Sequence, residues 1–313
     1  VKLETKNQKR YTDYSSYIKK KFGGRVQKVS INAGFTCPNI DGSKGKGGCT
    51  YCNNNTFNPE YCKPIKPISQ QIDEGIAFFA QMYKSQKYLA YFQAFTNTYA
   101  PLEELKQKYE QALKHKDVIG LVIATRPDCI TNEILDYLEQ LVKDGNFIKL
   151  EFGLESTNNK TLDLINRCQT HEDAIKAFDM AKNRGILLGA HIILGLPKES
   201  KEEMLNNVFA INNLPVDTLK IHHLQVVKHT MMAFQYKQDA SQFSFFTLDE
   251  YLDLIIDFLE ILNPKIIVER FFSESPEHLL IAPKYKLKNF ELVHKIEKRL
   301  QERNSWQGKF FNS

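Results

Sequence analysis

The sequence contains no run of 18 apolar residues and no charged-then-apolar amino-terminal segment, so we expect neither a membrane span nor secretion. It also lacks a GxGxxG or Walker motif, which argues against a dinucleotide-binding or P-loop nucleotide site. Its six cysteines in 313 residues, three of them clustered, do not form the pattern of a disulfide framework. Together these absences predict an enzyme of the reducing cytoplasm.

Charged residues are unevenly distributed, although the net charge is only +5. Residues 1–28 carry nine Lys/Arg against two acidic residues, and residues 284–309 carry eight against three. The two ends therefore hold +7 and +5, and the middle sums to −7. Basic ends around an acidic body favour a polyanionic partner, and two solvated basic tails are the simpler alternative.

Short apolar and β-branched runs alternate with amphipathic stretches through most of the chain. The runs predict strands at 27–33, 88–94, 118–124, 147–153, 186–193 and 217–222. Helical spacing predicts helices at about 69–84, 101–115, 131–143, 171–184 and 200–213. Apolar strands that alternate with helices are typical of a parallel sheet covered by helices. The six units predict an α/β fold, a partial (β/α)6 barrel, with its chemistry at the carboxyl ends of the strands.

The pattern changes after residue 230. A helix at about 247–262 and a strand at 265–270 precede an irregular stretch and a basic helix at about 289–304. We therefore divide the chain into a barrel with a basic amino-terminal segment, residues 1–230, and a carboxyl-terminal α/β extension with a basic helix, residues 231–313.

Three cysteines lie in one glycine-rich loop directly after the first predicted strand. Cys37, Cys49 and Cys52 have the spacing C-x11-C-x2-C. Three thiolates fit an iron–sulfur cluster that leaves one iron open for a second molecule. Cys62, further along the chain, would complete a four-ligand site, so structural zinc stays the alternative.

The cysteine loop and the segments behind it resemble the radical S-adenosylmethionine (SAM) superfamily, from Tyr14 to Gln307. Within it, the chain is similar to short bacterial proteins called YhcC-like and to the radical SAM domain of the elongator catalytic subunit. Most members have C-x3-C-x2-C, whereas the elongator-like branch shares the long first gap. The resemblance implies a [4Fe–4S] cluster on the three loop cysteines, SAM on the open iron, and Tyr51 near the SAM adenine.

Segments at the ends of later strands carry the resemblance further. Glu155 and Arg167 occupy positions that in related enzymes hold the SAM ribose and carboxylate. A carboxylate accepts hydrogen bonds from ribose hydroxyls, and a guanidinium offers a planar fork. His191 stands at the position of another ribose contact. The residues that the resemblance places at the SAM amino group are Gln93, Thr96 and Asn97.

Other polar residues receive weaker predictions. Cys129 and Cys168 lie outside the cluster loop, and we expect them to be buried thiols. Four residues follow the sixth predicted strand at the same mouth, where substrate contact and packing remain alternatives: His222, His223, Lys228 and His229.

The resemblance implies a radical SAM enzyme. An electron donor such as flavodoxin or ferredoxin would reduce the cluster, and SAM would yield a 5′-deoxyadenosyl radical that takes a hydrogen atom from the substrate. Elongator-like enzymes act on the C5 substituent of the tRNA wobble uridine, so we expect tRNA as partner and a tailoring step on that side chain. We expect no room for an acetyltransferase domain beside a barrel of about 230 residues.

Two alternatives to this function stay open. One is a radical SAM enzyme acting on a small metabolite or porphyrin-like substrate. The other is a non-catalytic zinc or iron–sulfur protein that binds nucleic acid.

Overall fold

The computed structural model describes residues 9–81 and 87–312. Two features predicted from the sequence lie partly outside these ranges. They are the charges of residues 1–8 in the basic amino-terminal segment and the end of the helix expected at 69–84.

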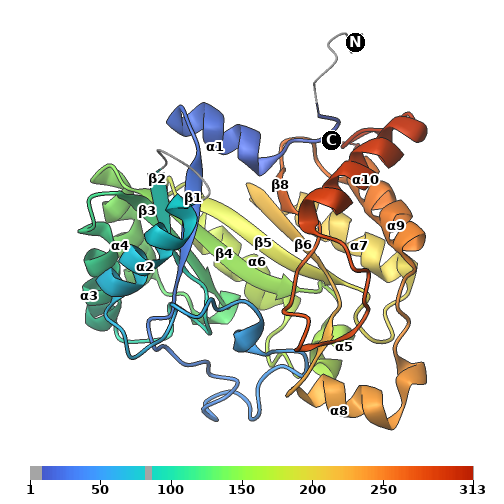
Figure 1. Ribbon diagram of the computed structural model, residues 1–313, viewed down its shortest axis with the longest axis horizontal. Coiled ribbons are helices and arrows are strands. Elements are labelled where there is room, and N and C mark those ends of the chain that lie inside the picture. Colours follow the sequence, from blue (N-terminus) through green and yellow to red (C-terminus); the bar gives the residue numbers. More distant parts are fainter. Residues whose placement is uncertain (1–8, 82–86, 313) are drawn as a thin grey trace.

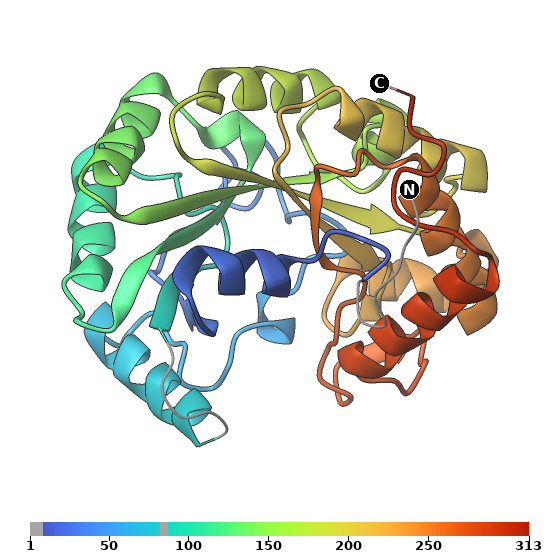
Figure 2. The ribbon, with the colours of Figure 1, turned by 90° about the horizontal axis from the view of Figure 1, so that it is seen from above.

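Seven parallel strands form one curled sheet, an open half-barrel (Figures 1 and 2). Their order in the sheet is β1-β2-β3-β4-β5-β6-β8, the same as their order in the chain. The α/β class and the partial barrel are therefore confirmed, with one strand more than the six units predicted. The strands are β1 (Val26–Ile31), β2 (Lys87–Phe92), β3 (Val118–Thr125), β4 (Phe147–Glu155), β5 (Leu187–Leu194), β6 (Thr218–His223) and β8 (Ile267–Arg270).

Helices cover the outer face of this sheet in the arc that Figure 2 shows. Thr131, Thr170, Ser200 and Thr247 each accept a backbone hydrogen bond as helix N-caps, which explains where four of the helices begin. The main apolar core lies between this arc and the sheet. The predicted helices are α2 (Ile68–Ala80), α3 (Leu102–Leu113), α4 (Asn132–Lys143), α6 (His171–Ala181), α7 (Lys201–Asn212), α9 (Leu248–Ile261) and α10 (Asn289–Glu302).

Several elements were not predicted from the sequence. They are α1 (Tyr14–Phe22), α5 (Asn159–Leu164), α8 (Met231–Gln238), the antiparallel pair β7 (Val226–Val227) and β9 (Leu280–Ala282), and the 3-10 turns η1 (Asn54–Thr56), η2 (Pro127–Cys129) and η3 (Ala240–Gln242). All of these elements are short. In the sequence, the three successive lysines of α1 favoured a solvated basic tail over a helix. In the structure α1 lies across the amino ends of the strands, inside the curl of the sheet (Figure 2).

The carboxyl-terminal extension is joined to the barrel through β8, which pairs in parallel with β6. The backbone NH of Val268 in this strand also donates to the Thr12 carbonyl at 2.8 Å, so β8 closes against the amino-terminal segment. Our division of the chain at residue 230 stays a prediction. In the described part of the chain, no helix has the length and apolar character needed to span a membrane.

The amino half of the barrel interior is filled by paired charges. Each of three ammonium groups lies within 4 Å of both of two carboxylates, and the side chains of the cluster are at most 18% exposed. Tyr14 of α1 covers them, with one ammonium group 4.5 Å from its ring centroid. We call this the ion cluster; its members are Lys28, Lys149, Lys220, Glu151 and Glu269.

Candidate active site at the carboxyl ends of the strands

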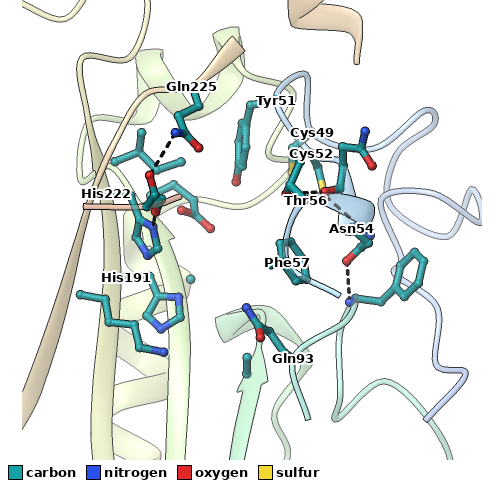
Figure 3. Close-up of a pocket in the computed structure, with 18 of the residues that line it drawn as sticks. Cys49, Tyr51, Cys52, Asn54, Thr56, Phe57, Gln93, His191, His222 and Gln225 are labelled. Atoms are coloured by element: carbon teal, nitrogen blue, oxygen red, sulfur yellow. Dashed lines mark hydrogen bonds between the residues drawn. The ribbon is translucent and has the colours of Figure 1, made fainter. Parts of the chain in front are cut away.

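A cavity of about 280 Å³ opens at the carboxyl ends of the strands. Figure 3 shows the loop that carries Cys49 and Cys52 on one side, and His191, His222 and Gln225 facing it from the other. Nine of the ten residues that the sequence predicts for the site line this cavity: Cys37, Cys49, Cys52, Tyr51, Gln93, Thr96, Glu155, Arg167 and His191.

The long gap between the first two cysteines is folded back on itself. The backbone NH of Gly48 donates to the Asn39 carbonyl at 2.8 Å, and Asp41 and Lys46 form an antiparallel bridge. Gly47 and Gly48 have φ of 79° and 76°, a left-handed turn that side chains disfavour. The eleven residues between Cys37 and Cys49 therefore form a loop that folds back on itself and brings its two ends close together.

The three cysteines line one cavity, and none is in a disulfide. Desolvation inside the cavity, followed by the charge of the Cys49 and Cys37 thiolates, raises the pKa of the Cys52 thiol to about 12. Neighbouring donors point at the sulfurs: Asn39 Nδ2 and Arg167 Nη1 each lie 3.5 Å from Cys49 Sγ. Hydrogen bonds to thiolate sulfur are among the means by which a protein tunes an iron–sulfur cluster.

This donor set suits a cluster better than a single ion. A [4Fe–4S] cluster binds each thiolate through a different iron, so its ligands lie farther apart than those of one metal ion. Among residues 9–81 and 87–312, no three His, Cys, Asp or Glu side chains are close enough to hold one metal ion. Cys62 is buried outside the cavity, with its thiol 4.0 Å from Asn58 Oδ1. The four-ligand zinc alternative therefore has no fourth thiol at this site.

Arg167 is buried at the base of the cysteine wall. Its Nη2 donates to the Gly153 carbonyl at 2.8 Å and lies 3.6 Å from Glu155 Oε1. Its Nε has no partner in the part of the chain that the structure describes. Glu155 itself has φ of 66°, a strained conformation of the kind that clusters at functional sites. The pair predicted from the sequence is therefore brought together at the cavity.

Two histidines face the cavity from β5 and β6. His191 Nε2 lies 3.1 Å from Glu151 Oε2, and its ring centroid is 5.6 Å from that of His222. Burial, followed by the charge of Lys220, lowers the pKa of His191. Burial and the neighbouring His191 hold the pKa of His222 well below its usual range. Both rings are therefore neutral near pH 7.

The segment after β2 contributes less than predicted. Gln93 lines the cavity and accepts a hydrogen bond from Ser30 Oγ at 3.4 Å, and Thr96 lines it while 1% exposed. Asn97 does not line the cavity, and its side-chain amide donates to the Ala124 carbonyl at 2.8 Å. The structure thus corrects the placement of Asn97, which supports the strand-end backbone behind the cavity wall.

Comparison with known proteins identifies the family. A model of the Radical SAM superfamily matches residues 42–209, and one of the Radical_SAM C-terminal domain matches residues 216–302. The chain belongs to the radical SAM superfamily. It is 36% identical to YtqA of Bacillus subtilis over 97% of this chain and 94% of that protein. It is 32% identical to YhcC of Escherichia coli K12 over 88% and 87% of the two chains.

Two more distant matches are to proteins larger than this chain. A tRNA uridine(34) acetyltransferase of Methanocaldococcus infernus is 29% identical over 63% of this chain and 36% of its own length. The structure of M. infernus Elp3 with an N-terminal deletion superposes with a TM-score of 0.66 and 18% identity. The alignment covers 90% of this chain and 64% of that one, and at this identity the likeness shows the fold. The predicted structural resemblance to the elongator radical SAM domain is confirmed.

Radical SAM enzymes use a [4Fe–4S] cluster and SAM, so the predicted class and cofactors are confirmed. The residues that hold these groups in this chain are not tested by the comparisons and stay predictions. Cys129 and Cys168 lie outside the cavity and are half-buried, which is less burial than expected.

The structure shows the contacts of the residues whose roles the sequence left open. His222 shares a hydrogen bond with Ser273, and His223 stacks on Phe272 at 4.2 Å, where burial lowers its pKa to about 3. The backbone carbonyl of Lys228 accepts from Asn53 Nδ2 at 2.8 Å. Lys228 therefore joins the carboxyl-terminal region to the cysteine loop through its backbone.

Sequence reasoning missed several residues of the cavity wall. All but Phe57, which lies in the cysteine loop, share one signal: a polar or charged residue inside a strand or shortly after one, where the surrounding run is apolar. The alternation Lys149-Leu150-Glu151 in β4 was the clearest case. The missed lining residues include Phe57, Tyr91, Glu151, Lys220, Gln225, Arg270 and Ser273.

Proposed function

We propose that Cys37, Cys49 and Cys52 hold the [4Fe–4S] cluster in this cavity, and that the enzyme modifies the C5 side chain of the tRNA wobble uridine. The observation that supports this choice of substrate is the sequence similarity to a tRNA uridine(34) acetyltransferase over 63% of this chain. The proposal covers a tailoring step on an existing side chain, because the matching region is 36% of that relative.

Bound to the three thiolates, the cluster would supply the electron that cleaves SAM and starts hydrogen-atom abstraction. The chain's own residues would bind and orient SAM. Arg167 offers its charge beside Cys49, Glu155 offers acceptors for hydroxyls, and Tyr51 offers an aromatic face. Neutral His191 stays hydrogen-bonded to Glu151, which fixes the orientation of its ring in the cavity. Flavodoxin or ferredoxin remains our prediction for the electron donor.

An exposed aromatic ring inside the cavity supports a nucleotide substrate. Phe57 is 37% exposed and projects from the cysteine wall into the cavity (Figure 3). Aromatic faces stack on bases that have left a single-stranded loop, at roughly 1–3 kcal/mol per base. A splayed uridine that enters between Phe57 and the opposite wall would place its C5 side chain near SAM.

The basic ends contribute less positive charge than the sequence predicts. Lys28 belongs to the buried ion cluster. Arg299 of α10 pairs with Asp249 at 2.8 Å, and Arg303, directly after α10, pairs with Asp257 at 2.7 Å. The lysines of α1 lie at the end of the barrel opposite the cysteine loop (Figure 1). We therefore assign the main contact with tRNA to the cavity mouth.

A nucleoside comparison tests this proposal. Digested tRNA from cells with and without the gene is compared by mass spectrometry, and the deletion is complemented with wild type or with a Cys37→Ala/Cys49→Ala/Cys52→Ala variant. We expect one modified uridine to disappear in the deletion, to return with wild type and to stay absent with the variant. Identical nucleosides in all four strains would contradict the tRNA assignment and leave a small metabolite as substrate.

A further inference from the structure

Arg270 stands apart from the other arginines of the cavity. It ends β8, is half-buried and lines the cavity. Among the described residues, no hydrogen bond or ion pair engages its guanidinium, whereas Arg126 lies 2.9 Å from Asp128 and Arg167 lies 3.6 Å from Glu155. A half-buried charge without a partner costs free energy unless a ligand completes it.

The surroundings of Arg270 carry excess positive charge. Lys220 is its register partner on β6. Lys220 belongs to the ion cluster, in which three ammonium groups share only two carboxylates. The charges of Arg270 and Lys220 both act on His222, after burial and His191, to lower its pKa. Glu274 also lines the cavity, and its Oε1 accepts from the backbone NH of Asn289 at the start of α10. That carboxylate is therefore committed to a helix terminus.

The backbone around Arg270 is fixed in advance. Tyr251 Oη donates to the Phe271 carbonyl at 2.5 Å. Gln225 Nε2 donates to the Ser273 carbonyl at 3.0 Å, and Ser275 Oγ donates to Gln225 Oε1 at 2.7 Å. A side chain that projects from a fixed backbone needs to order only its own rotamers when it binds a ligand.

We propose that Arg270 binds an oxyanion of the substrate, with Ser273 and Gln225 at its side. An arginine fork pairs with phosphate or carboxylate through two parallel hydrogen bonds. The proposal rests on the function above: in tRNA the oxyanion is a backbone phosphate or a carboxylate on the uridine side chain. Arg270 lies within the match to the Radical_SAM C-terminal domain, whereas the predicted SAM residues lie within or before residues 42–209.

Chemical labelling tests the oxyanion site without tRNA. The anaerobically reconstituted enzyme is treated with phenylglyoxal in the presence of inorganic phosphate, acetate or neither, and each arginine is followed by peptide mass spectrometry. We expect Arg270 to react readily and one of the two anions to slow it severalfold, which also distinguishes a phosphate from a carboxylate site. Arg184, which pairs outside the cavity with Asp136 and Glu139, is the internal control. No protection of Arg270 by either anion would overturn the proposal.

Variants separate substrate binding from SAM binding. Arg270→Gln should lower kcat/KM for tRNA by roughly 10- to 100-fold, and Arg270→Lys should restore part of it. SAM affinity and iron content should match those of wild type and of the control Arg184→Gln. A loss of SAM affinity in Arg270→Gln would overturn the proposal, because Arg270 would then belong to the SAM site. If wild type modifies no tRNA but phosphate protects Arg270, the tRNA function fails and the oxyanion site stands.

Discussion

The two ends of the barrel interior use charge in opposite ways. At the amino end, the five members of the ion cluster satisfy one another beneath α1. At the carboxyl end, the thiols and the strained Glu155 line a cavity together with Arg270, which has no hydrogen-bond or ion-pair partner among the described residues. Glu151 and Lys220 of the ion cluster also reach this cavity, but their charges are paired. Charges that are already paired can stabilise or specify a fold but have little left to offer a ligand. The comparison therefore separates a closed end that maintains the barrel from an open end that binds and reacts.

The largest expected effect is at the open end. Alanine at Cys37, Cys49 or Cys52 should remove iron from the anaerobically reconstituted protein and abolish formation of 5′-deoxyadenosine, because two thiolates do not hold the cluster. Cys62→Ala is the matched control, since Cys62 is buried outside the cavity. Full iron content in any of the three variants, or its loss in Cys62→Ala, would contradict the ligand assignment.

At the closed end, Glu269→Gln should lower the free energy of unfolding by about 3–5 kcal/mol, because three buried ammonium groups lose a shared carboxylate. Denaturant unfolding of the purified protein measures this. Glu277→Gln, at an exposed residue after β8, is the control and should change little. Equal stability of the two variants would show that the ion cluster does not maintain the fold.

Much of this architecture could be predicted from local sequence. The strands were found because runs such as that of β3 are apolar on both faces. The cysteine loop was found because the spacing of its three cysteines is typical of a metal site. The insertion of α1 and the pairing of β8 with β6 were missed, since both depend on contacts between distant segments: Thr218 pairs with Ile267 across 49 residues, and Asp13 bridges to Val268 across 255.

The residues of the site likewise fall into those that the sequence predicted and those that it did not. Arg167 and Glu155 were found by position after a strand, and the structure brings them together. Asn97 was misplaced because its neighbours line the cavity while its own side chain turns to the Ala124 carbonyl. The sequence could not predict that Arg270 has no ion-pair partner among the described residues, because the fold decides which carboxylates lie near it.

Arg167→Ala should weaken SAM binding by roughly 10- to 150-fold, the loss of one charge-assisted contact of about 1.5–3 kcal/mol. Equilibrium binding of SAM to the reconstituted protein measures this. Iron content is the essential control, because Arg167 also lies 3.5 Å from Cys49 Sγ. Unchanged SAM affinity with intact iron would remove Arg167 from the SAM site.

Lowering the pH should reduce the stability that the ion cluster contributes, because Glu269 becomes protonated. Burial opposes ionisation of this carboxyl, but Lys149, Lys220 and Lys28 outweigh it and hold its pKa well below 4.5. Its contribution to stability is therefore complete above pH 4.5 and is lost as the pH falls toward the folded-state pKa. The difference in unfolding free energy between wild type and Glu269→Gln should shrink below pH 4.5. A difference that grows with acid would contradict this sign.

The smallest effect is expected from charges outside both ends of the interior. Neutralising the exposed Lys19, Lys20 and Lys21 should reduce the slope of the salt dependence of tRNA binding by no more than about 1, because α1 lies at the end of the barrel opposite the cysteine loop. Neutralising Lys295 and Lys298 on α10 should do less, since Lys298 already lies 3.5 Å from Glu302. Filter binding over a salt series measures both, and an α10 effect larger than that of α1 would show that the pairing on α10 is lost in the complex.

The contrast between the two ends is tested most directly by measuring Glu269→Gln and Arg167→Ala side by side. For each variant, the unfolding free energy and the SAM affinity of the folded, iron-loaded protein are determined in one buffer. We expect Glu269→Gln to lose stability and keep SAM affinity, and Arg167→Ala to lose SAM affinity and keep most of its stability. If both variants lose both properties to the same degree, the barrel interior is one coupled unit, and the division into a structural and a reactive end is wrong.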